Sequence, residues 1–344
     1  MRIFEAAAAG GHELVAMSAD ASVGYRGIIA IHSTALGPAV GGTRWWRYPT
    51  EDAAIVDALR LARGMSYKNA LANLPLGGGK SVILAPEGPH DRAAILRAHG
   101  RFVDRFGGRY LTAEDVGTSP ADMEFIAETT RYVAGRTSTS GDPSPHTARG
   151  VFRAMQAAAR FRWGSDDLAG RRVVVQGVGN VGLALVGQLR AAGATVSVSD
   201  IDAARVERAV AEFGAGVVPA DRAHAADADI YAPSALGGIL NDETIPALRA
   251  TVVVGAANNQ LLEPRHGRAL AERDILYVPD YVANAGGVCY GGAIEVAKVT
   301  KADAISRVEA IYETTLGVLE RARADGIPPS DAADRMAELR LRAG

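Results

Sequence analysis

The chain has 344 residues, of which 48% are apolar and 22% charged, and its formal net charge is −2. This length suits two globular domains, and this charge excludes the basic surfaces that bind nucleic acid or anionic membranes. The single cysteine, Cys289, excludes an internal disulfide and a cysteine metal cluster, and the seven histidines lack metal-ligand spacing, so we expect no metal. The first residues carry no apolar signal core and no apolar run is long enough to span a membrane, so we expect a cytoplasmic protein.

The first predicted elements are a strand at residues 27–32 and a turn-rich loop at residues 36–44. Gly41 and Gly42 in this loop leave backbone N–H groups uncovered by side chains, which suits a ligand that approaches closely. Two glycines that serve only a tight turn explain the same pattern equally well, so both interpretations stay open at this point.

Two lysines come next, and apolar sequence surrounds both of them. Residues 50–65 have apolar side chains at helical spacing, with Thr50 as the cap, and Lys68 follows at the end of this predicted helix. Lys80 is predicted on a glycine-rich loop before a short buried strand at residues 81–85. Burying an ammonium group is costly without a partner, which predicts an anionic ligand. A desolvated lysine near another cation also loses pKa and becomes a usable base.

The same loop contains the sequence Gly-Gly-Lys-Ser at residues 78–81, which is the end of the GxxxxGK[ST] pattern of nucleotide-binding loops. That pattern requires glycine at position 74, where this chain has Leu74. The predicted order is also helix–loop–strand, whereas a nucleotide-binding loop needs strand–loop–helix. We therefore exclude an ATP or GTP site here.

A helix is predicted over residues 92–106, and a short strand then leads into two adjacent carboxylates, Glu114 and Asp115. One of them could face a cleft and exchange a proton. Alternatively, they belong to the start of the helix that begins near Ser119, where acidic residues are common. The local sequence alone favours the second interpretation.

A polar, proline-rich connection at residues 135–145 marks the best domain boundary. A helix at residues 147–160 follows, and a buried strand at residues 171–176 then meets Gly177-Val178-Gly179-Asn180-Val181-Gly182. This GxGxxG opens a helix, and Asp200 ends the next strand, 23 residues after the first glycine. The motif in this strand–turn–helix context predicts a dinucleotide site, and an acid at that spacing favours NAD over NADP.

Three further strands are predicted at residues 229–233, 251–255 and 275–279, and each ends in small or polar residues. The carboxyl ends of parallel strands bind ligands in such sheets, so the asparagines there are candidate contacts for nicotinamide or substrate: Asn258, Asn259 and Asn284. The tail is predicted to form one long amphipathic helix at residues 302–324 and a last helix at residues 330–342, with stripes that suit core packing.

Together these motifs resemble the leucine/valine/phenylalanine dehydrogenase family of amino-acid dehydrogenases, and the pattern is most similar to leucine dehydrogenase. The resemblance runs from about Phe4 to the tail. It is carried by LGPAVGGTR at 36–44, ALRLARGMSYKNA at 58–70, PLGGGKSVI at 75–83, TAEDVGTS at 112–119, GDPSPHTARGV at 141–151, QGVGNVG at 176–182, GAANNQL at 255–261 and PDYVANAGGV at 279–288.

The resemblance implies an α/β fold of two domains, an N-terminal α/β substrate and catalytic domain at residues 1–138 and a Rossmann-type NAD-binding domain at residues 139–327. The last helix, about residues 328–344, is expected to pack back onto the first domain. Lys80 would be the catalytic base that activates water, its pKa lowered towards neutrality. Asp115 would relay a proton to and from the amino group, which replaces the helix-start interpretation.

The same resemblance assigns binding roles. Lys68 would bind the substrate α-carboxylate, helped by one of Asn258 and Asn259, and the backbone of Gly41 and Gly42 would approach the substrate. NAD would lie on residues 177–182 and Asp200. Further contacts would come from Thr147, Ala235, Ala256 and Asn284. The implied side-chain pocket is apolar and without a cation, which argues against glutamate as substrate: Val40, Ala113, Val288 and Gly291.

The sequence leaves two classes of preferred substrate open, branched-chain and aromatic amino acids. Overall similarity favours branched-chain amino acids, but Val40 and Gly291 are smaller than the aliphatic residues expected in leucine-type pockets, so a roomier pocket could admit phenylalanine or tryptophan. A 2-hydroxy-acid dehydrogenase would need a histidine–carboxylate pair and a substrate-binding arginine, and no histidine lies in such a motif. A non-catalytic NAD sensor is disfavoured by the two lysines and Asp115. Cys289 is expected to be a small buried apolar residue. Relatives form assemblies, so we expect a homo-oligomer.

Overall fold

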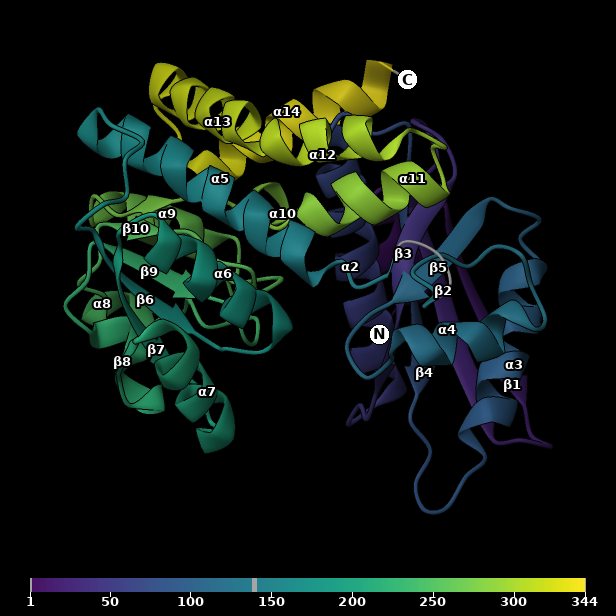
Figure 1. The fold of residues 1–344 in the computed structure, drawn as a ribbon. Coiled ribbons are helices and arrows are strands. Elements are labelled where there is room, and N and C mark those ends of the chain that lie inside the picture. Colours follow the sequence, from purple (N-terminus) through teal and green to yellow (C-terminus); the bar gives the residue numbers. More distant parts are fainter. Residues whose placement is uncertain (1, 138–140, 344) are drawn as a thin grey trace. The chain divides into compact units, whose positions relative to one another are not determined.

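The computed structural model describes residues 2–137 and 141–343, and Figure 1 gives the course of the chain. Contacts between Cα atoms divide the chain into two compact units. The first comprises Met1–Asp142, Gly291–Lys301 and Ala337–Gly344, and the second comprises Pro143–Tyr290 and Ala302–Met336. The predicted boundary between residues 138 and 139 lies outside the described residues. The segment 291–301, which we had assigned to the second domain, clusters with the first.

The described residues of the first unit form a five-stranded mixed sheet in the order β1-β2-β4-β3-β5. β3, β4 and β5 are parallel, whereas β2 runs antiparallel to both β1 and β4. The strands span Leu14–Asp20 (β1), Tyr25–Ser33 (β2), Ala39–Trp46 (β3), Gly77–Leu84 (β4) and Tyr110–Glu114 (β5). The helices are Ile3–Ala9 (α1), Glu51–Leu71 (α2), Arg92–Asp104 (α3), Pro120–Ala127 (α4) and, after the second unit's sheet, Ala293–Glu295 (α11).

The two faces of this sheet differ because side chains alternate along each strand. Ile29, Ile31 and Ile83 pack with residues of α3 and α4 in one apolar cluster. On the opposite face, Ile28 and Val82 pack with α2 in a second cluster. α2 therefore covers the face on which the even-numbered residues of β3 and β4 lie, and this is the face that carries Lys80.

Two sequence predictions for this unit were wrong in the same way. Residues 36–44, predicted as a turn-rich loop, contribute most of β3, which lies between β4 and β5 in the sheet. Lys80, predicted on a glycine-rich loop, lies inside β4, because the strand begins at Gly77 rather than at Ser81. Glycine disfavours strands in general, but here backbone neighbours lie where the missing side chains would be.

The helix predictions were more accurate. Thr50 caps α2, its side chain accepting from the N–H of Ala53, and the helix continues past Met65 so that Lys68 lies in its last turn. The cap of α4 is Ser119, which forms a capping box with Asp122. Asp115 is therefore not a helix cap, and the interpretation that the local sequence favoured was wrong.

The described part of the second unit contains a six-stranded sheet in the order β8-β7-β6-β9-β10-β11, and all its strand pairs are parallel. Numbered by chain position this order is 3-2-1-4-5-6, the order of Rossmann dinucleotide-binding folds. The strands are Arg172–Gln176 (β6), Thr195–Ser199 (β7), Gly216–Val217 (β8), Ile230–Pro233 (β9), Val252–Val253 (β10) and Leu276–Tyr277 (β11). The predicted α/β fold with a doubly wound parallel sheet is thus confirmed.

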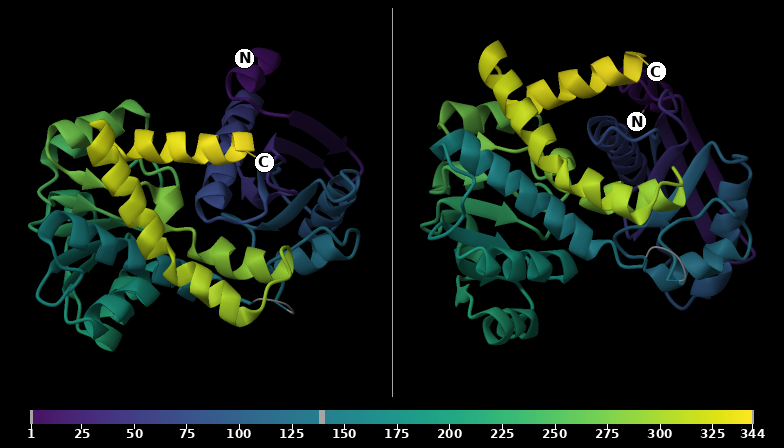
Figure 2. Two further views of the ribbon diagram at one scale, coloured as in Figure 1. Left: turned by 90° about the horizontal axis from the view of Figure 1, so that it is seen from above. Right: turned by 45° about the horizontal axis from the view of Figure 1, so that its top comes forward.

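Helices lie between the strands of this sheet and make up the tail. They span Ser144–Trp163 (α5), Asn180–Ala191 (α6), Ala203–Phe213 (α7), Ala220–Ala225 (η1), Thr244–Ala247 (α8), Arg265–Glu272 (α9), Asp280–Ala283 (α10), Val288–Gly292 (η2), Lys301–Glu309 (α12), Ile311–Asp325 (α13) and Pro329–Ala343 (α14). The predicted tail helix is thus divided in two at Ala310, and α13 lies along α5 (Figures 1 and 2). α13 ends at Gly326 in the left-handed conformation, and α14 follows after a sharp turn (Figure 2).

The last turns of α14 belong to the first unit. There Glu338 accepts a hydrogen bond of 2.9 Å from the hydroxyl of Tyr67, and Arg340 donates to the carbonyls of Ala70 and Leu71 at the end of α2. Among the described residues, no helix combines the length and hydropathy that crossing a membrane requires.

Candidate active site and cofactor site

Lys80 is almost entirely buried, with 3% of its surface exposed. Its ammonium lies 2.7 Å from Oδ1 of Asp115, which follows the end of β5. β3 lies between β4 and β5, so the two side chains meet across the surface of the sheet. Two of the predicted site residues, 35 positions apart in the chain, are therefore brought into direct contact.

A second cation holds the other oxygen of the same carboxylate. Arg44 on β3 donates from Nε to Oδ2 of Asp115 at 2.8 Å and from Nη1 to Oδ2 of Asp57 at 2.9 Å. Asp57 projects from α2 and also accepts from the hydroxyl of Tyr48 at 2.5 Å. Lys80, Asp115, Arg44 and Asp57 thus form a row of alternating charges, and we call these four residues the charge row.

Burial and neighbouring charges set the protonation of this pair. Burial lowers the pKa of Lys80 below its usual value, and Arg44 adds to this, while Asp115 acts in the opposite direction. Burial alone would raise the pKa of Asp115, but Lys80 and Arg44 together hold it below its usual range. The structure therefore favours an ionised carboxylate beside a lysine that gives up its proton more easily than lysine does in water.

Glu114, the neighbour of Asp115, has the opposite character. Burial, followed by the negative charges of Asp142 and Asp115, raises the pKa of Glu114 to about 7. Of the two adjacent carboxyls that the sequence offered, the structure makes Asp115 the ionised one and leaves Glu114 to gain a proton near neutrality.

Gly41 and Gly42 lie in β3 rather than in a turn, so the tight-turn interpretation was wrong. A Cβ on Gly41 would lie 1.7 Å from the carbonyl oxygen of Gly79, and a Cβ on Gly42 would lie 2.8 Å from Cβ of Asp115. Both positions require glycine because neighbouring strands and the side chain of Asp115 occupy the space. Val40 and Ala113 lie on the same face of the sheet, Val40 buried and Ala113 half-buried.

Lys68 is half-buried in the last turn of α2. It lies eleven residues after Asp57, about three turns of helix, so both side chains project from the same side of α2. Nearby, Asn69 donates from Nδ2 to the carbonyl of Gly77 at 2.6 Å, which fixes the end of α2 against the start of β4. The helix that carries Lys68 is therefore held against the strand that carries Lys80.

The glycine motif of the second unit lies where the strand order reverses, between β6 and β9. Gly177 has φ of +96°, and a Cβ on it would lie 2.7 Å from Cβ of Ala235, which follows β9. A Cβ on Gly182 would lie 1.9 Å from the carbonyl oxygen of Gly177. A Cβ on Gly179 would instead meet only Nη1 of Arg205, at the ordinary contact distance of 3.6 Å. Asn180 and Val181 form the first turn of α6, which has no side-chain cap.

This arrangement fits the pyrophosphate of a dinucleotide, since backbone N–H groups are uncovered at a helix start and a guanidinium lies beside them. Asp200 follows β7 and accepts from the N–H of Val178 at 2.8 Å and from that of Asp202 at 3.0 Å. Asp202 in turn caps α7, so Asp200 remains the acid next to the glycine motif.

The three asparagines separate into a pair and a single residue. Asn284 donates from Nδ2 to Oδ1 of Asn258 at 2.8 Å and to the carbonyl of Ala256 at 3.1 Å, and its own Oδ1 is buried with no hydrogen-bond partner among the described residues. Asn259 has φ of +52°, and its N–H donates to the buried carboxylate of Asp280. Asn258 and Asn284 therefore act together, whereas Asn259 serves a turn.

The remaining predicted residues lie around residues 284–287, a turn that leads into a helical segment. A Cβ on Gly286 would lie 1.9 Å from the carbonyl of His146, and a Cβ on Gly287 would lie 2.7 Å from Oγ1 of Thr147, so these glycines let the segment pack on the start of α5. Val288 and Gly291 are both half-buried in the π-helical segment η2, and Cys289 between them is buried, as predicted.

Comparison with known proteins identifies the family of this chain. The model of the Glu/Leu/Phe/Val dehydrogenase dimerisation domain matches residues 12–132, and the model of glutamate/leucine/phenylalanine/valine dehydrogenase matches residues 140–209 and 202–313. The chain belongs to this dehydrogenase family. It is an amino-acid dehydrogenase, an oxidoreductase that acts on CH–NH₂ donors, and the family uses NAD or NADP.

Individual relatives of this dehydrogenase match along nearly its whole length. Leucine dehydrogenase from Thermoactinomyces intermedius is 50% identical, over 99% of this chain and 94% of its own length. Valine dehydrogenase from Streptomyces virginiae is 48% identical, over 96% of this chain and 94% of its own. The crystal structure of L-tryptophan dehydrogenase from Nostoc punctiforme superposes with a TM-score of 0.84 at 44% identity, covering 99% of this chain and 98% of that one.

Sequence reasoning missed several residues of this dehydrogenase. Arg44 was visible as the last residue of LGPAVGGTR, but no role was assigned to it. The sequence marked Asp57 only as a charged residue in the apolar part of α2, and it gave no indication that Tyr48 belongs to the site. Arg205 lies in the first turn of α7, and only the fold brings it to Gly179.

Proposed function

We propose that this enzyme catalyses the reversible, NAD-dependent oxidative deamination of an apolar L-amino acid to the 2-oxo acid and ammonia, with branched-chain substrates preferred. The single observation that carries this proposal is the buried contact between Lys80 and Asp115, which supplies a lysine of lowered pKa beside an ionised acid. Oxidative deamination requires both a base for water and a carrier for the amino-group proton.

Each chemical role is assigned to a residue of this chain. Lys68 binds the substrate α-carboxylate, with help from Asn258. Asp115 accepts a proton from the substrate ammonium, which leaves the neutral amine that can lose hydride from its α-carbon. Bound NAD supplies the hydride acceptor. Lys80, in its neutral form, then takes a proton from the water that attacks the iminium carbon. Asp115 gives its proton to the amino group of the resulting carbinolamine and takes up the hydroxyl proton as the C–N bond breaks and ammonia leaves.

Cofactor choice is part of the proposal. The glycine motif, the start of α6 and Arg205 suit the pyrophosphate, and Asp200 beside Val178 suits the ribose hydroxyls and repels a 2′-phosphate. Asn284, whose buried Oδ1 lacks a described partner, is assigned to the nicotinamide carboxamide. Thr147, Ala235 and Ala256 are assigned to the same nicotinamide half of the cofactor.

Substrate choice is assigned from the apolar residues. Val40, Ala113, Val288 and Gly291 provide no cation for a side-chain carboxylate, which argues against glutamate. The leucine and valine dehydrogenases that are 50% and 48% identical in sequence to this chain support branched-chain substrates. The alternative is an aromatic substrate, favoured by the small Gly291 and by the similarity to a tryptophan dehydrogenase.

The test is NADH formation at alkaline pH with L-leucine, L-valine, L-phenylalanine, L-tryptophan and L-glutamate, repeated with NADP. We expect the highest kcat/KM for a branched-chain substrate with NAD. Turnover on none of the five would overturn the proposal, preference for glutamate would overturn the pocket assignment, and preference for an aromatic substrate would select the alternative. We also propose a homo-oligomer, supported by the match to a dimerisation domain, and light scattering after size exclusion tests it.

A further inference from the structure

Two members of the charge row, Arg44 and Asp57, have no direct part in the chemistry proposed above. Their side chains are nevertheless fixed by hydrogen bonds to each other, to Asp115 and to Tyr48. The side chain of Arg44 is 16% exposed and that of Asp57 is 25% exposed, and the fork of Arg44 donates to both Asp57 and Asp115. Taking a guanidinium and a carboxylate out of water is costly unless each is paired. A half-buried, fully paired arrangement of this kind indicates a task at the site.

The row runs without a break from β4 to α2. Its successive distances are 2.7 Å from Lys80 to Asp115, 2.8 Å from Asp115 to Arg44 and 2.9 Å from Arg44 to Asp57, and the hydroxyl of Tyr48 completes it at 2.5 Å from Asp57. Two positive and two negative charges alternate, so the row is neutral when every member is ionised. Loss of the negative charge of Asp57 therefore leaves the positive charge of Arg44 only partly compensated, close to Lys80.

We propose that Arg44 and Asp57 are positioning residues that hold Asp115 ionised and aimed at Lys80, so that the charge balance of the row sets the pH at which Lys80 becomes a base. This inference rests on the proposed function. The inference adds that Asp57 on α2, which touches neither Lys80 nor Asp115 directly, adjusts the pH dependence of the enzyme.

Two geometric arguments support the positioning role. Arg44 contacts Oδ2 of Asp115 while Lys80 contacts Oδ1, so the guanidinium fixes the rotation of the carboxylate and leaves one oxygen for the ammonium. Asp57 engages the far side of the same guanidinium, which prevents Arg44 from turning both of its donor edges to Asp115.

Charge arguments point in the same direction. The charged groups that act on Lys80 come from each surrounding element: Asp115 after β5, Arg44 on β3 and Asp57 on α2. Lys68 projects from the same side of α2 as Asp57. Glu114 aligns with Thr43 and Ser81 in the sheet, so its side chain lies on the opposite face from Lys80. Among the charged groups, Arg44 lowers the pKa of Lys80, while Asp115 and Asp57 raise it. Removing the negative charge of Asp57 therefore lets Lys80 lose its proton at lower pH, and removing the positive charge of Arg44 does the reverse.

The first experiment measures kcat/KM against pH for Asp57→Asn and for Glu51→Gln. Glu51 is the matched control, because it also lies on α2 and loses one negative charge but is exposed and paired with Arg26. We expect the acid limb of the Asp57→Asn profile to move to lower pH by about 0.5 to 1 unit and that of the control to stay in place. Identical limbs for both variants and the wild type would overturn the proposal.

A second pair of variants separates charge from geometry. Arg44→Gln removes the positive charge, so its acid limb is expected to move to higher pH. Arg44→Lys restores the charge but cannot form the two-sided fork, so its limb is expected to return near the wild-type position while kcat stays about tenfold or more lower. If Arg44→Lys restores kcat fully, or leaves the limb where Arg44→Gln has it, the assignment is wrong.

A measurement without turnover keeps this inference distinguishable from the proposed reaction. The chain has only four lysines, Lys68, Lys80, Lys298 and Lys301, so lysine labelled with ¹³C at Cε gives few NMR signals to titrate. The signal lost in Lys80→Ala identifies Lys80. In the folded protein, its midpoint is expected to fall in Asp57→Asn and to stay in Glu51→Gln. An unchanged midpoint would contradict the inference even if the enzyme turns over leucine, and a shifted one would support it even if the substrate is different.

Discussion

The ammonium of Lys80 lies 2.7 Å from Oδ1 of Asp115 in a nearly dry part of the sheet surface. The two residues stabilise each other's ionised forms, yet burial favours a neutral lysine. The pair is therefore poised between two protonation states, which is the condition that a base working near neutral pH requires.

Replacing either member should abolish most of the turnover. We expect Lys80→Ala and Asp115→Asn to lower kcat by about 10²- to 10⁴-fold, the usual contribution of a positioned acid or base. The NAD dissociation constant, measured by fluorescence titration, should change little, because the glycine motif belongs to the second unit. Lys301→Ala, which removes an exposed lysine, is the control. Near-normal turnover by Lys80→Ala would sink the mechanism.

The glycine motif makes a prediction about the cofactor. A methyl group on Gly182 would lie 1.9 Å from the carbonyl oxygen of Gly177, so Gly182→Ala must displace the loop. We expect the KM for NAD to rise about tenfold or more, with a smaller change in the KM for the amino acid. Kinetics at saturating concentrations of the other substrate measure each value.

Gly317→Ala is the matched control for this variant. Gly317 lies inside α13 of the same unit, and a Cβ there meets nothing within 4 Å. Alanine is the better helix former, so this change should stabilise the protein by about 0.5–1 kcal/mol without altering either KM. If both variants leave the KM for NAD unchanged, the motif does not bind the cofactor.

These sites differ in how far the sequence could predict them. A dinucleotide site could be predicted because Gly177, Gly182 and Asp200 follow a local order of strand, turn, helix and strand, and the structure has this order. The parallel sheet followed from short apolar runs, each ending in small or polar residues. Both signals depend on residues near each other in the chain.

Other features could not be predicted because they depend on distant partners. β3 was missed because a proline precedes it and two glycines lie inside it, and only its neighbours β4 and β5 show why Gly41 must lack a side chain. The contacts of Arg44 with Asp57 and Asp115 join three elements, so no spacing in the sequence reports them. The interruption at Ala310 between α12 and α13 carries no glycine or proline, which explains why one long helix was predicted.

A buried histidine predicts how the protein responds to acid. His99 is fully buried between α3 and the sheet, hydrogen-bonded to the hydroxyls of Tyr25, Thr43 and Ser81. Burial lowers the pKa of His99 to about 3, against about 6.5 in the unfolded chain. Between these values the unfolded chain binds more protons, so the free energy of unfolding should fall as pH falls from about 6.5 to 3. The full effect of His99 is up to about 5 kcal/mol.

The variant His99→Gln isolates this contribution. At pH 7 it should be less stable than the wild type, because it loses hydrogen bonds in a packed interior. At pH 5 the difference should be about 2 kcal/mol smaller, since the wild type has by then lost stability that glutamine never had. Urea unfolding at fixed protein concentration measures both. A difference that is the same at pH 7 and pH 5 would show that His99 does not titrate as described. His32, whose burial lowers its pKa to about 4, should add a smaller slope of the same sign.

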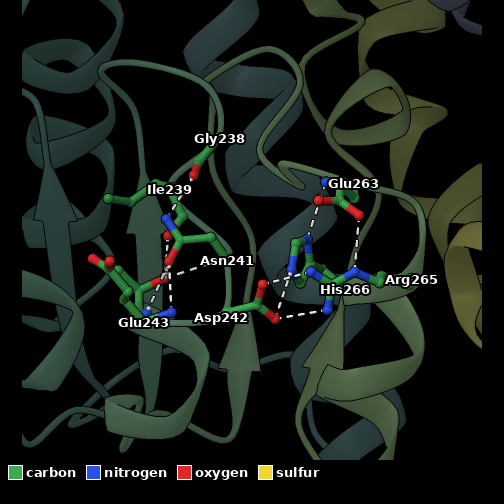
Figure 3. A network of polar contacts seen from close by, with 9 residues as sticks. Gly238, Ile239, Asn241, Asp242, Glu243, Glu263, Arg265 and His266 are labelled. Carbon is green, nitrogen blue, oxygen red and sulfur yellow. Dashed lines mark hydrogen bonds and ion pairs between the residues drawn. The ribbon is translucent and has the colours of Figure 1, made fainter.

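A polar network at the start of α9 makes the last prediction, this time for an exposed carboxylate (Figure 3). Asp242 accepts from both Nη1 and Nη2 of Arg265, at 2.7 and 2.5 Å, and from Nε2 of the buried His266 at 3.3 Å. The other ring nitrogen of His266 accepts from the N–H of Glu263 at 3.0 Å, which fixes the tautomer. These contacts fasten α9 to the loop that follows β9.

Hydrogen bonds from Arg265 are the main cause that lowers the pKa of Asp242 to about 2, from about 3.8 in the unfolded chain. The stability that this carboxylate contributes is therefore complete above pH 4 and is lost as the pH falls towards 2. Asp242→Asn should lower the melting temperature at pH 6, and the difference from the wild type should shrink by pH 3. Glu243→Gln, which removes the neighbouring charge, should lower it less at pH 6 and show no such trend. Calorimetry at both pH values measures these melting temperatures. If both variants lower the melting temperature equally at each pH, only net charge matters at this surface and the prediction for Asp242 is wrong.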